Sequence, residues 1–268
     1  MLADYFYLPE EATLTAEQPE PIIRVEHLRA EFGDNLVFED VSFQVNRGEI
    51  FVILGGSGCG KTTLLKHLVG LYRPTAGQVV VNGVDIVRQD PQQMYRMRVG
   101  TGMLFQAGAL FGSMTLAENI ALPLQKYTDL SRETIDLIVK MKLGLVNLSG
   151  YENHLPEEIS GGMKKRAGLA RAMALDPAIL FFDEPSAGLD PISAVELDLL
   201  IKSLNAGLGT TMVIVTHELQ SIFLIAHRII MLDKQAKGII AEGDPVYLKD
   251  HATDPIVRNF FNRQPMSA

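Results

Sequence analysis

The stretch that decides the fold is Ile159–Pro191, ISGGMKKRAGLARAMALDPAILFFDEPSAGLDP. Its first half predicts a helix, because small and apolar residues recur at three- and four-residue spacing after a Ser-Gly-Gly turn, until the Asp176-Pro177 pair ends the pattern. The N-terminus of a helix carries unpaired backbone N–H groups and a partial positive charge. The residues of the turn are therefore a candidate anion-binding site: Ser160, Gly161 and Gly162.

The second half of this stretch predicts a buried strand that ends in two acids. Residues 178–184, AILFFDE, are continuously apolar up to Asp183 and Glu184, as expected for a central strand of a parallel sheet. Asp190 and Pro191 then have the residue types favoured at the N-cap and first position of a helix. Two acids at a strand end are by themselves as consistent with a simple cap as with a chemical site.

A phosphate-binding loop lies upstream of this stretch. An apolar strand over 49–56 and a helix over 61–70 flank the sequence GGSGCGKT, which fits the pattern G-x-x-x-x-G-K-[ST] in its required strand-to-helix position. In such a loop backbone N–H groups surround phosphate oxygens, the lysine reaches the β and γ phosphates, and the hydroxyl ligates Mg²⁺. The predicted nucleotide-binding residues here are Gly55, Gly56, Ser57, Gly58, Cys59, Gly60, Lys61, Thr62 and Thr63.

The remaining strands place further polar residues near this loop. Strands that alternate with helices indicate an α/β fold with a parallel sheet, whose ligands bind at the carboxyl ends of the strands. A strand over 99–106 ends at Gln106, and one over 210–217 ends at His217. We therefore expect His217 to converge with Lys61 and with the acids of 178–184.

Once the phosphate loop is present, the two acids have separate expected roles. Asp183 would hold Mg²⁺, directly or through water, together with Thr62. Glu184 would point the other way along the strand, where it could orient an attacking water as a general base. The simple-cap interpretation then becomes the minor alternative.

Composition excludes several classes of protein. Lys and Arg number 24 and Asp and Glu number 32, which gives a formal charge of −8 and argues against a nucleic-acid partner. Cys59 is the only cysteine, so an internal disulfide framework and a cysteine zinc cluster are excluded, and a redox role for this thiol is the minor alternative. The chain shows neither a secretory signal nor a run of about 18 apolar residues, so we expect a cytoplasmic location.

Three blocks of different character are predicted along the chain. Alternating residues over 22–32 and 37–45 predict an antiparallel hairpin, and 77–86 predicts another with an Asn-Gly turn. Residues 107–174 carry helix caps and helical spacing, and look like a helical insertion.

The two ends of the chain are predicted to lie outside the main domain, which covers 22–243. Residues 1–21 are acidic and contain prolines, which favours a disordered leader. Residues 244–268 are predicted to form one short amphipathic helix and a frayed tail.

Taken together, the motifs over 22–243 resemble those of ABC-type ATPases, in the family's order. They are a Walker A loop (Gly55–Thr62), a Q-loop glutamine (Gln106), a signature (Ser160–Met163), a Walker B strand with its glutamate (Ile179–Glu184), a D-loop (Ala187–Asp190) and an H-loop histidine (His217). The resemblance implies an ABC-type P-loop ATPase fold, in which a RecA-like parallel-sheet core carries an antiparallel β subdomain and a helical subdomain. These match the three predicted blocks.

The resemblance also implies roles for single residues. Phe32 stands where the family places an aromatic that stacks on adenine, with a hairpin-core aromatic as the alternative. Gln106 would contact Mg²⁺ and link the nucleotide site to a transmembrane partner, and Asp190 belongs to the nucleotide site. His217 would contact the γ-phosphate region and support the attacking water, with a simple strand-end histidine as the alternative.

The family's geometry implies that the chain works as a homodimer. Ser160 and Gly162 of one copy would cap the ATP that the Walker A loop of the other copy holds, so two chains in head-to-tail apposition would enclose two nucleotides. A single chain would then be a poor ATPase. Closure around ATP and reopening after hydrolysis would drive transmembrane permease subunits.

Three segments point to a subfamily. Met163 stands where most members have glutamine, and residues 105–124, 160–177 and 216–233 look most like the ATPase of Mla/Mce-type phospholipid transporters. This predicts an ATPase that powers phospholipid transfer, peripheral on the cytoplasmic face of a bacterial inner membrane. The partners so implied are an Mce-domain lipid-binding protein and a small regulatory subunit.

Other functions stay open at this point. The chain could instead serve an importer or exporter of another solute, such as an amino acid or a lipoprotein. A soluble ABC ATPase acting on chromosomes or ribosomes would need a long coiled coil between the Walker motifs or two tandem domains, and the sequence has neither. A non-enzymatic nucleotide-binding regulator would lack Glu184 or His217, and both are present.

Overall fold

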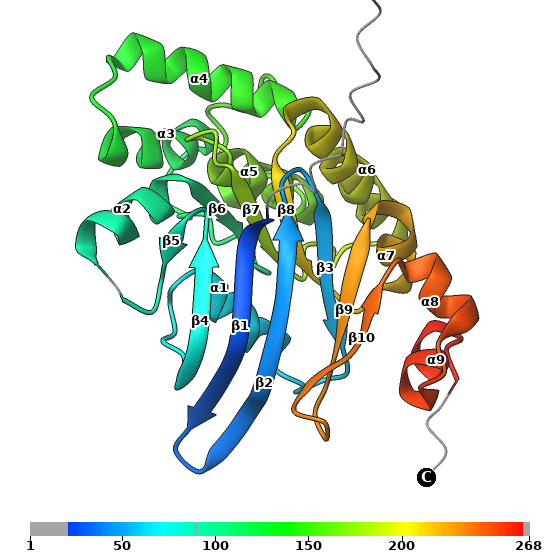
Figure 1. Cartoon of the computed structure of the whole chain (residues 1–268). Coiled ribbons are helices and arrows are strands. Elements are labelled where there is room, and N and C mark those ends of the chain that lie inside the picture. Colours follow the sequence, from blue (N-terminus) through cyan, green and yellow to red (C-terminus); the bar gives the residue numbers. More distant parts are fainter. Residues whose placement is uncertain (1–20, 89, 265–268) are drawn as a thin grey trace, which may run out of the picture.

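The computed structural model describes residues 21–88 and 90–264 (Figure 1). The leader predicted over 1–21 lies outside the described residues, except for Pro21, which starts the first strand. Figure 1 shows α3, α4 and α5 gathered at one end of the molecule, and α8 and α9 beside the edge strand β10.

A six-stranded sheet with the order β10-β9-β3-β8-β7-β6 forms the centre of the molecule. Five strands run parallel, and only β10 is antiparallel to its neighbour. Its members are β3 (Ile50–Gly55), β6 (Thr101–Leu104), β7 (Ile179–Asp183), β8 (Thr211–Val215), β9 (Arg228–Asp233) and β10 (Gly238–Gly243). The predicted α/β class with a parallel core sheet is confirmed.

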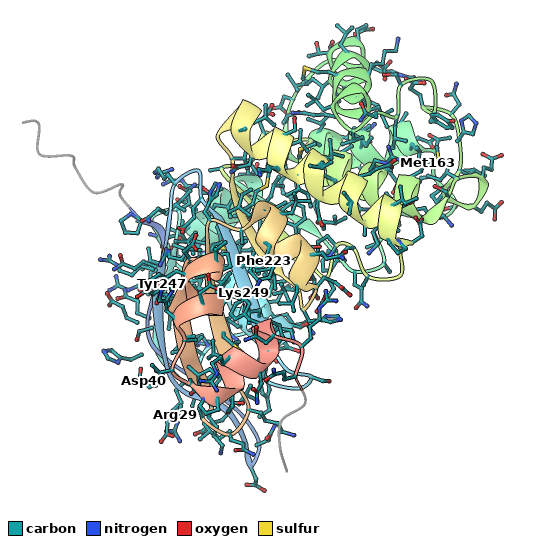
Figure 2. The ribbon with its side chains drawn as sticks, turned by 90° about the vertical axis from the view of Figure 1, so that its right-hand side faces the viewer. Arg29, Asp40, Met163, Phe223, Tyr247 and Lys249 are labelled. Atoms are coloured by element: carbon teal, nitrogen blue, oxygen red, sulfur yellow. The ribbon has the colours of Figure 1, made fainter. Side chains whose placement is uncertain are left out.

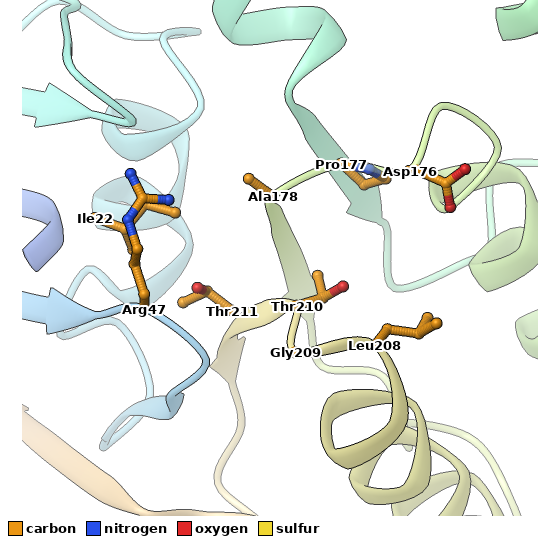
Figure 3. Close-up of a pocket in the computed structure, with 9 residues that line it drawn as sticks. All are labelled: Ile22, Arg47, Asp176, Pro177, Ala178, Leu208, Gly209, Thr210 and Thr211. Carbon is orange, nitrogen blue, oxygen red and sulfur yellow. The ribbon is translucent and has the colours of Figure 1, made fainter. Parts of the chain in front are cut away.

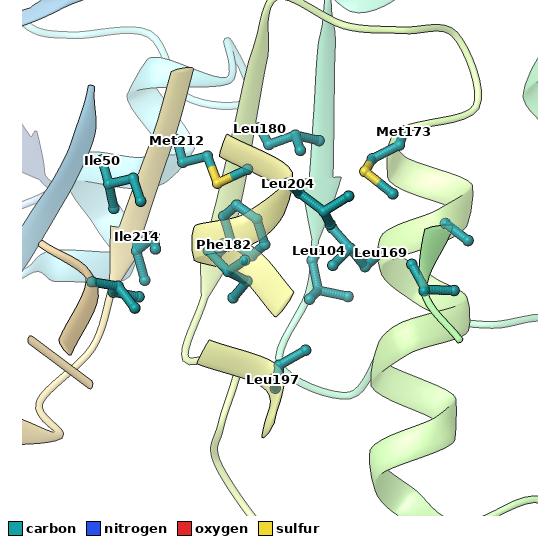
Figure 4. Packing of buried hydrophobic residues seen from close by; sticks show 14 of the residues in the cluster. Ile50, Leu104, Leu169, Met173, Leu180, Phe182, Leu197, Leu204, Met212 and Ile214 are labelled. Atoms are coloured by element: carbon teal, nitrogen blue, oxygen red, sulfur yellow. The ribbon is translucent and has the colours of Figure 1, made fainter. Parts of the chain in front are cut away.

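Alternate residues of β3 enter two separate cores, because successive side chains of a strand point to opposite faces. Ile50, Val52 and Leu54 belong to a core that contains residues of α5, α6 and α7. Phe51 and Ile53 belong to a second core, shared with α1 and the antiparallel strands. Figure 4 shows part of the first core. The central strands are thus buried on both faces, which explains their continuous apolar runs.

The antiparallel sheet has the order β2-β1-β4-β5. Its strands are β1 (Pro21–Phe32), β2 (Asn35–Asn46), β4 (Ala76–Val81) and β5 (Val84–Asp85). Asn82 and Gly83, with φ of 48° and 77°, form the turn between β4 and β5. Both predicted hairpins are therefore present in the structure.

The helical block begins with a capping box, as predicted. The Thr115 hydroxyl accepts a hydrogen bond from the N–H of Glu118, and the Glu118 carboxylate accepts one from the N–H of Thr115. The Ser131 side chain caps the next helix. The elements of this block are α3 (Leu116–Tyr127), α4 (Arg132–Leu145), the 3₁₀ helix η1 (Pro156–Glu158) and α5 (Gly161–Ala172).

The end of the chain differs from the prediction. The segment 244–268 forms two short helices instead of one, α8 (Pro245–His251) and α9 (Pro255–Phe261), and its last four residues lie outside the described part. Val257 and Phe261 of α9 are buried, and Phe261 lies against Phe223 with ring centroids 5.7 Å apart. Figure 2 shows Tyr247 and Lys249 of α8 far from Met163 at the other end of the molecule. Two separate helix caps divide the segment.

One further helix, α2 (Pro91–Val99), was not predicted, and it shortens the strand expected over 99–106 to β6. The helices that complete the core are α1 (Lys61–Leu68), α6 (Pro191–Leu208) and α7 (Leu219–Ile225). Asp190 and Pro191 are the N-cap and first residue of α6, as predicted.

A buried acid joins α6 to α7. Asp198 of α6 is buried, and its Oδ1 atom has no hydrogen-bond partner among the described residues. Burial raises the pKa of the Asp198 carboxyl above its ordinary value; the hydroxyl of Ser221 acts against this rise and the carboxylate of Glu218 adds to it. An acid with a raised folded-state pKa contributes stability at low pH that is lost as pH rises through that pKa.

Replacing this acid by its neutral isostere should therefore stabilise the fold in a pH-dependent way. We expect Asp198→Asn to raise the free energy of unfolding by about 1–3 kcal/mol near pH 8, since no buried charge then forms. The gain should shrink as pH falls, because protonation removes the buried charge of wild-type Asp198. Urea unfolding near pH 8 and at progressively lower pH measures it. Asp129→Asn, in an exposed loop, is the control, and a gain independent of pH would contradict the prediction.

Candidate nucleotide-binding site

The phosphate loop, Gly55–Thr62, joins β3 to α1. Gly60 precedes the helix with φ of 100°, and a Cβ atom there would lie 2.6 Å from the ring of Phe38, so only glycine fits. Helix α1 has no side-chain cap at its N-terminus. Its backbone N–H groups therefore suit an anion such as phosphate.

Lys61 lies folded back over the phosphate loop. Its Nζ atom donates hydrogen bonds to the backbone carbonyls of Gly55 at 2.9 Å and Gly56 at 3.0 Å. The ammonium is therefore held at the mouth of the loop, where a phosphate group bound by the N–H groups would meet it.

Thr62 and Asp183 meet across the site, as predicted. The Thr62 hydroxyl donates to Asp183 Oδ1 at 3.1 Å. A hydroxyl and a carboxylate are hard oxygen ligands, which suit Mg²⁺. The described residues contain no group of three or more His, Cys, Asp or Glu side chains that could hold a metal by themselves. The donor set therefore fits an ion that takes its other ligands from phosphate and water.

Glu184 does not continue the strand, contrary to the sequence prediction. β7 ends at Asp183, and Glu184 has φ of 47°, a left-handed conformation that costs energy for a non-glycine residue and recurs at functional sites. Its N–H donates to the Val215 carbonyl at 2.9 Å, which anchors it to β8. The separation of the two acids thus comes from a backbone turn instead of from strand alternation.

The carboxylate of Glu184 contacts His217. Glu184 Oε1 lies 2.9 Å from His217 Nδ1, and Glu184 Oε2 is buried with no hydrogen-bond partner among the described residues. The imidazole therefore fixes the orientation of the carboxylate, whose capacity to accept hydrogen bonds is not fully used within the described residues. The pair can therefore orient a water molecule beside bound phosphate.

Lys61, Thr62, Glu184 and His217 line one pocket of 820 Å³. Asp183 is not in its wall but contacts it through Thr62. Most residues predicted for the nucleotide lie in its wall: Gly55, Gly56, Ser57, Gly58, Gly60, Lys61, Thr62, Thr63, Gln106, Glu184 and His217. Cys59 is buried beneath the loop, and burial raises the pKa of its thiol, so the unreactive protonated form is favoured. The structure thus brings together the predicted residues of the phosphate loop and of three strand ends.

Other predicted residues do not line this pocket. Ser160 is exposed at the N-terminus of α5, where its hydroxyl accepts from the Met163 N–H at 3.3 Å, and Gly162 packs beside Ser193. The carboxylate of Asp190 accepts from the first N–H groups of α6, and its hydrogen bonds with Ser193 lower its pKa. These residues and Gly161 form a separate surface at the start of α5 and α6.

Phe32 also lies outside the pocket wall. Its ring packs edge-on against Tyr72 with centroids 5.2 Å apart, and 46% of the residue is exposed. Both readings of this residue, adenine contact and hairpin aromatic, remain consistent with that position, so its predicted role stays a prediction.

Three residues of the pocket wall were missed from the sequence, Asn35, Val37 and Phe260, and a fourth, Ala187, was named there only as the start of the D-loop. Phe260 is the unexpected one, because it comes from the C-terminal helix α9. No local signal in the sequence marks it, since only the docking of α9 on the core brings it to the phosphate loop.

A smaller pocket of 300 Å³ lies at the other edge of the parallel sheet (Figure 3). It includes Ala178, next to the start of β7, and Thr211, at the start of β8. These are the amino ends of the strands, where parallel sheets do not build their ligand sites. None of the predicted nucleotide residues lines it.

Comparison with known proteins decides the family. The family model described as "ABC transporter" matches residues 38–187. The chain belongs to the ABC transporter family. The family match and the ATP-binding relatives support an ABC-type ATPase.

Curated ABC relatives cover most of the chain. It is 42% identical over 240 residues to the "Probable ribonucleotide transport ATP-binding protein mkl" of Mycobacterium tuberculosis, which covers 90% of this chain but only 66% of that protein. It is 42% identical over 222 residues to the "Intermembrane phospholipid transport system ATP-binding protein MlaF" of Haemophilus influenzae, which covers 83% of both chains. The MlaF of Escherichia coli K12 is 41% identical over 231 residues, which cover 86% of this chain and 84% of that protein.

Solved ABC structures share the fold. A dimer of the ATP-binding cassette MJ0796 with ADP and Pi has a TM-score of 0.74 and 28% identity, and covers 83% of this chain and 98% of that one. CbiO1 of Clostridium perfringens, part of the transporter complex cbiONQ, has a TM-score of 0.78 and 25% identity, and covers 86% of this chain and 90% of that one. In residues 21–88 and 90–264, no helix combines the length and the apolar character that a bilayer crossing requires.

Proposed function

We propose that this chain is the ATP-hydrolysing subunit of a phospholipid transporter, that it binds Mg²⁺ with ATP, and that two copies enclose two nucleotides. The observation that carries the dimeric arrangement is the separation of the signature turn, Ser160–Met163, from the pocket of its own chain. A helix N-terminus with an exposed serine suits a phosphate, and a second copy would supply that phosphate. The MJ0796 dimer with ADP and Pi is a structural relative that supports this arrangement.

Each residue of the pocket would have a defined task in hydrolysis. The loop N–H groups and the Lys61 ammonium would bind and orient the β and γ phosphates, and Thr63 would extend the loop contacts. Thr62 and Asp183, with Gln106, would hold Mg²⁺, which when bound neutralises phosphate charge.

Proton transfer would fall to Glu184. Its carboxylate would accept a proton from the attacking water as a general base, while His217 holds the other carboxylate oxygen and reaches the γ-phosphate region. Pre-organisation by the strained backbone at Glu184 would keep the base in position without side-chain rearrangement.

A permease subunit would dock in an apolar groove beside Gln106. This groove has a volume of 550 Å³ and lies between β6, α3 and α5. Its rim carries two aromatic residues on either side of Gln106, Phe105 and Phe111, which are 40% and 50% exposed. Exposed aromatics in an apolar groove are typical of interface hot spots, and their position would transmit nucleotide state to the partner.

Removing the aromatic ring of Phe111 from the groove should uncouple the ATPase from its partner. We expect Phe111→Ser to lower the stimulation of ATP hydrolysis by co-purified membrane subunits about tenfold, through the loss of apolar contact area. The basal rate of the isolated chain should stay within about twofold, because Phe111 is not in the wall of the nucleotide pocket. Tyr247→Ser, an exposed aromatic on α8, is the control. Equal loss in both variants would place the permease elsewhere.

The phospholipid assignment is supported by the two MlaF relatives, which are named for intermembrane phospholipid transport. Such a function would place the chain on the cytoplasmic face of a bacterial inner membrane, with an Mce-domain protein and a small regulatory subunit as further partners. The test is to purify the native complex and identify its subunits and bound lipid by mass spectrometry. A hydrophilic-solute receptor without phospholipid would overturn the lipid assignment.

A second function is favoured by one observation. A mycobacterial relative that covers 90% of this chain is named for ribonucleotide transport. The chain could therefore energise movement of another solute with the same ATPase chemistry. Stimulation of ATP hydrolysis in proteoliposomes by a nucleotide, and not by a phospholipid acceptor, would select this alternative.

A further inference from the structure

Two cationic side chains of helix α5 donate hydrogen bonds to the loop that follows β6. Lys165 Nζ donates a hydrogen bond to the backbone carbonyl of Gln106. Arg171, six residues later on the helix, donates to the carbonyls of Gly108 at 3.2 Å and Ala109 at 2.8 Å. Three carbonyls in four residues of this loop thus accept hydrogen bonds from one helix.

A glycine on the same face of α5 allows this close approach. Gly168 lies between the two cationic residues at helical spacing, and a Cβ atom there would come within 3.0 Å of the Gly108 carbonyl oxygen and 2.9 Å of Leu104 Cδ1. The loop backbone therefore packs directly on the helix backbone. We call the three residues Lys165, Gly168 and Arg171 the α5 clasp.

Lys165 is the member of the clasp whose charged group is buried. Only 6% of this residue is exposed, and its one hydrogen bond among the described residues is to the Gln106 carbonyl. Burial lowers the pKa of its ammonium group, while the nearby carboxylates of Asp183 and Glu184 favour the charged form. A buried charge of this kind rarely adds stability over an apolar residue of similar size. We therefore look for a role of Lys165 other than stabilising the fold.

The location of Gln106 suggests the role of Lys165. Gln106 lies in the wall of the nucleotide pocket together with Glu184 and Lys61. Its side chain is exposed there, and within residues 21–88 and 90–264 the Gln106 backbone has no other hydrogen bond to the core. We propose that Lys165 is a positioning residue, which fixes the backbone of Gln106 so that its side chain stays at the nucleotide.

The clasp also joins this loop to the signature turn. Ser160 caps the same helix whose next turns hold the loop, so a displacement of Gln106 would move α5 and Ser160 with it. This second consequence rests on the proposed function, in which Ser160 serves the nucleotide of the partner copy. The positioning of Gln106 in the pocket of its own chain does not depend on that proposed function.

Removing the ammonium should therefore slow hydrolysis without weakening the fold. In the purified transporter complex we expect Lys165→Met to lower kcat about tenfold, with KM for ATP within about twofold. The thermal midpoint should stay within about 3 °C of wild type, since a buried charge is replaced by an apolar side chain of similar length. Lys165→Arg should restore at least about half of kcat, because it keeps a donor. Lys140→Met, on the exposed face of α4, is the control.

A double-variant experiment separates positioning from mere packing. If Lys165 acts through Gln106, adding Lys165→Met to Gln106→Ala should lower kcat by less than about twofold further. The proposal would be overturned if the kcat losses of the two single variants multiplied in the double variant, or if kcat were unchanged in Lys165→Met. A kcat loss in proportion to a fall in the thermal midpoint would also overturn it. Should Lys165→Met not fold, the same cycle is run with Lys165→Gln, which keeps a shorter donor. Absence of ATPase activity in wild type would instead count against the proposed function.

Discussion

Glu184→Gln should abolish most ATP hydrolysis while leaving ATP binding intact. We expect kcat to fall roughly 10²–10⁴-fold, because an amide cannot accept the proton of the attacking water. The substitution keeps the size of the side chain and its ability to contact His217 at Nδ1, which now lies 2.9 Å from Oε1. Steady-state phosphate release measures the loss, and equilibrium binding of a fluorescent ATP analogue measures what is retained.

The outcome distinguishes a base from a structural acid. ATP should then hold the variant in the dimeric state, since hydrolysis no longer reopens it. Glu26→Gln, on the exposed face of β1, is the matched control and should hydrolyse ATP at the wild-type rate. Hydrolysis by Glu184→Gln at a rate close to that of Glu26→Gln would remove Glu184 from the role of base.

An Asp-Pro pair stands at the start of four helices, although only the one at α6 was predicted from it. Asp190-Pro191 was read correctly as the start of α6. The same pair begins three helices that were missed or merged, and in each the aspartate accepts from N–H groups of the first turn: Asp90-Pro91, Asp244-Pro245 and Asp254-Pro255. This local signal is physical, because Asp satisfies unpaired N–H groups and Pro needs none.

A fifth Asp-Pro pair shows why the dipeptide alone does not decide. Asp176-Pro177 follows a helix, and Asp176 has a left-handed φ of 48°. Its carboxylate pairs with Lys142, a buried residue of α4. The same two residue types thus end one element here and begin another elsewhere, depending on a tertiary partner that the local sequence does not contain.

The site was predictable wherever a general rule links sequence to position. Lys61, Glu184 and His217 follow separate strands, and parallel strands bring their carboxyl ends to one edge, so the convergence follows from the strand order. No such rule covers Phe260 on α9 or the left-handed turn at Glu184. Both depend on how the finished core packs.

The signature turn lies outside the pocket of its own chain, and this leads to the second large effect. Lys61→Ala removes the ammonium from the phosphate loop, and Ser160→Arg blocks the N-terminus of α5. We expect each variant alone to lose at least about 10²-fold in ATPase activity. If two copies build each site, a mixed dimer of these variants has one site in which both lesions fall and one site that is intact.

Mixed dimers should therefore recover activity that neither parent has. Co-expression with two different affinity tags isolates them, and we expect at least about ten times the activity of either homodimer, up to about half that of wild type. The matched control mixes Lys61→Ala with Glu184→Gln, whose lesions lie in the same pocket. That mixture leaves both sites damaged and should stay inactive. A mixture of Lys61→Ala and Ser160→Arg that stays equally inactive would show that the signature turn does not complete the site of a second copy.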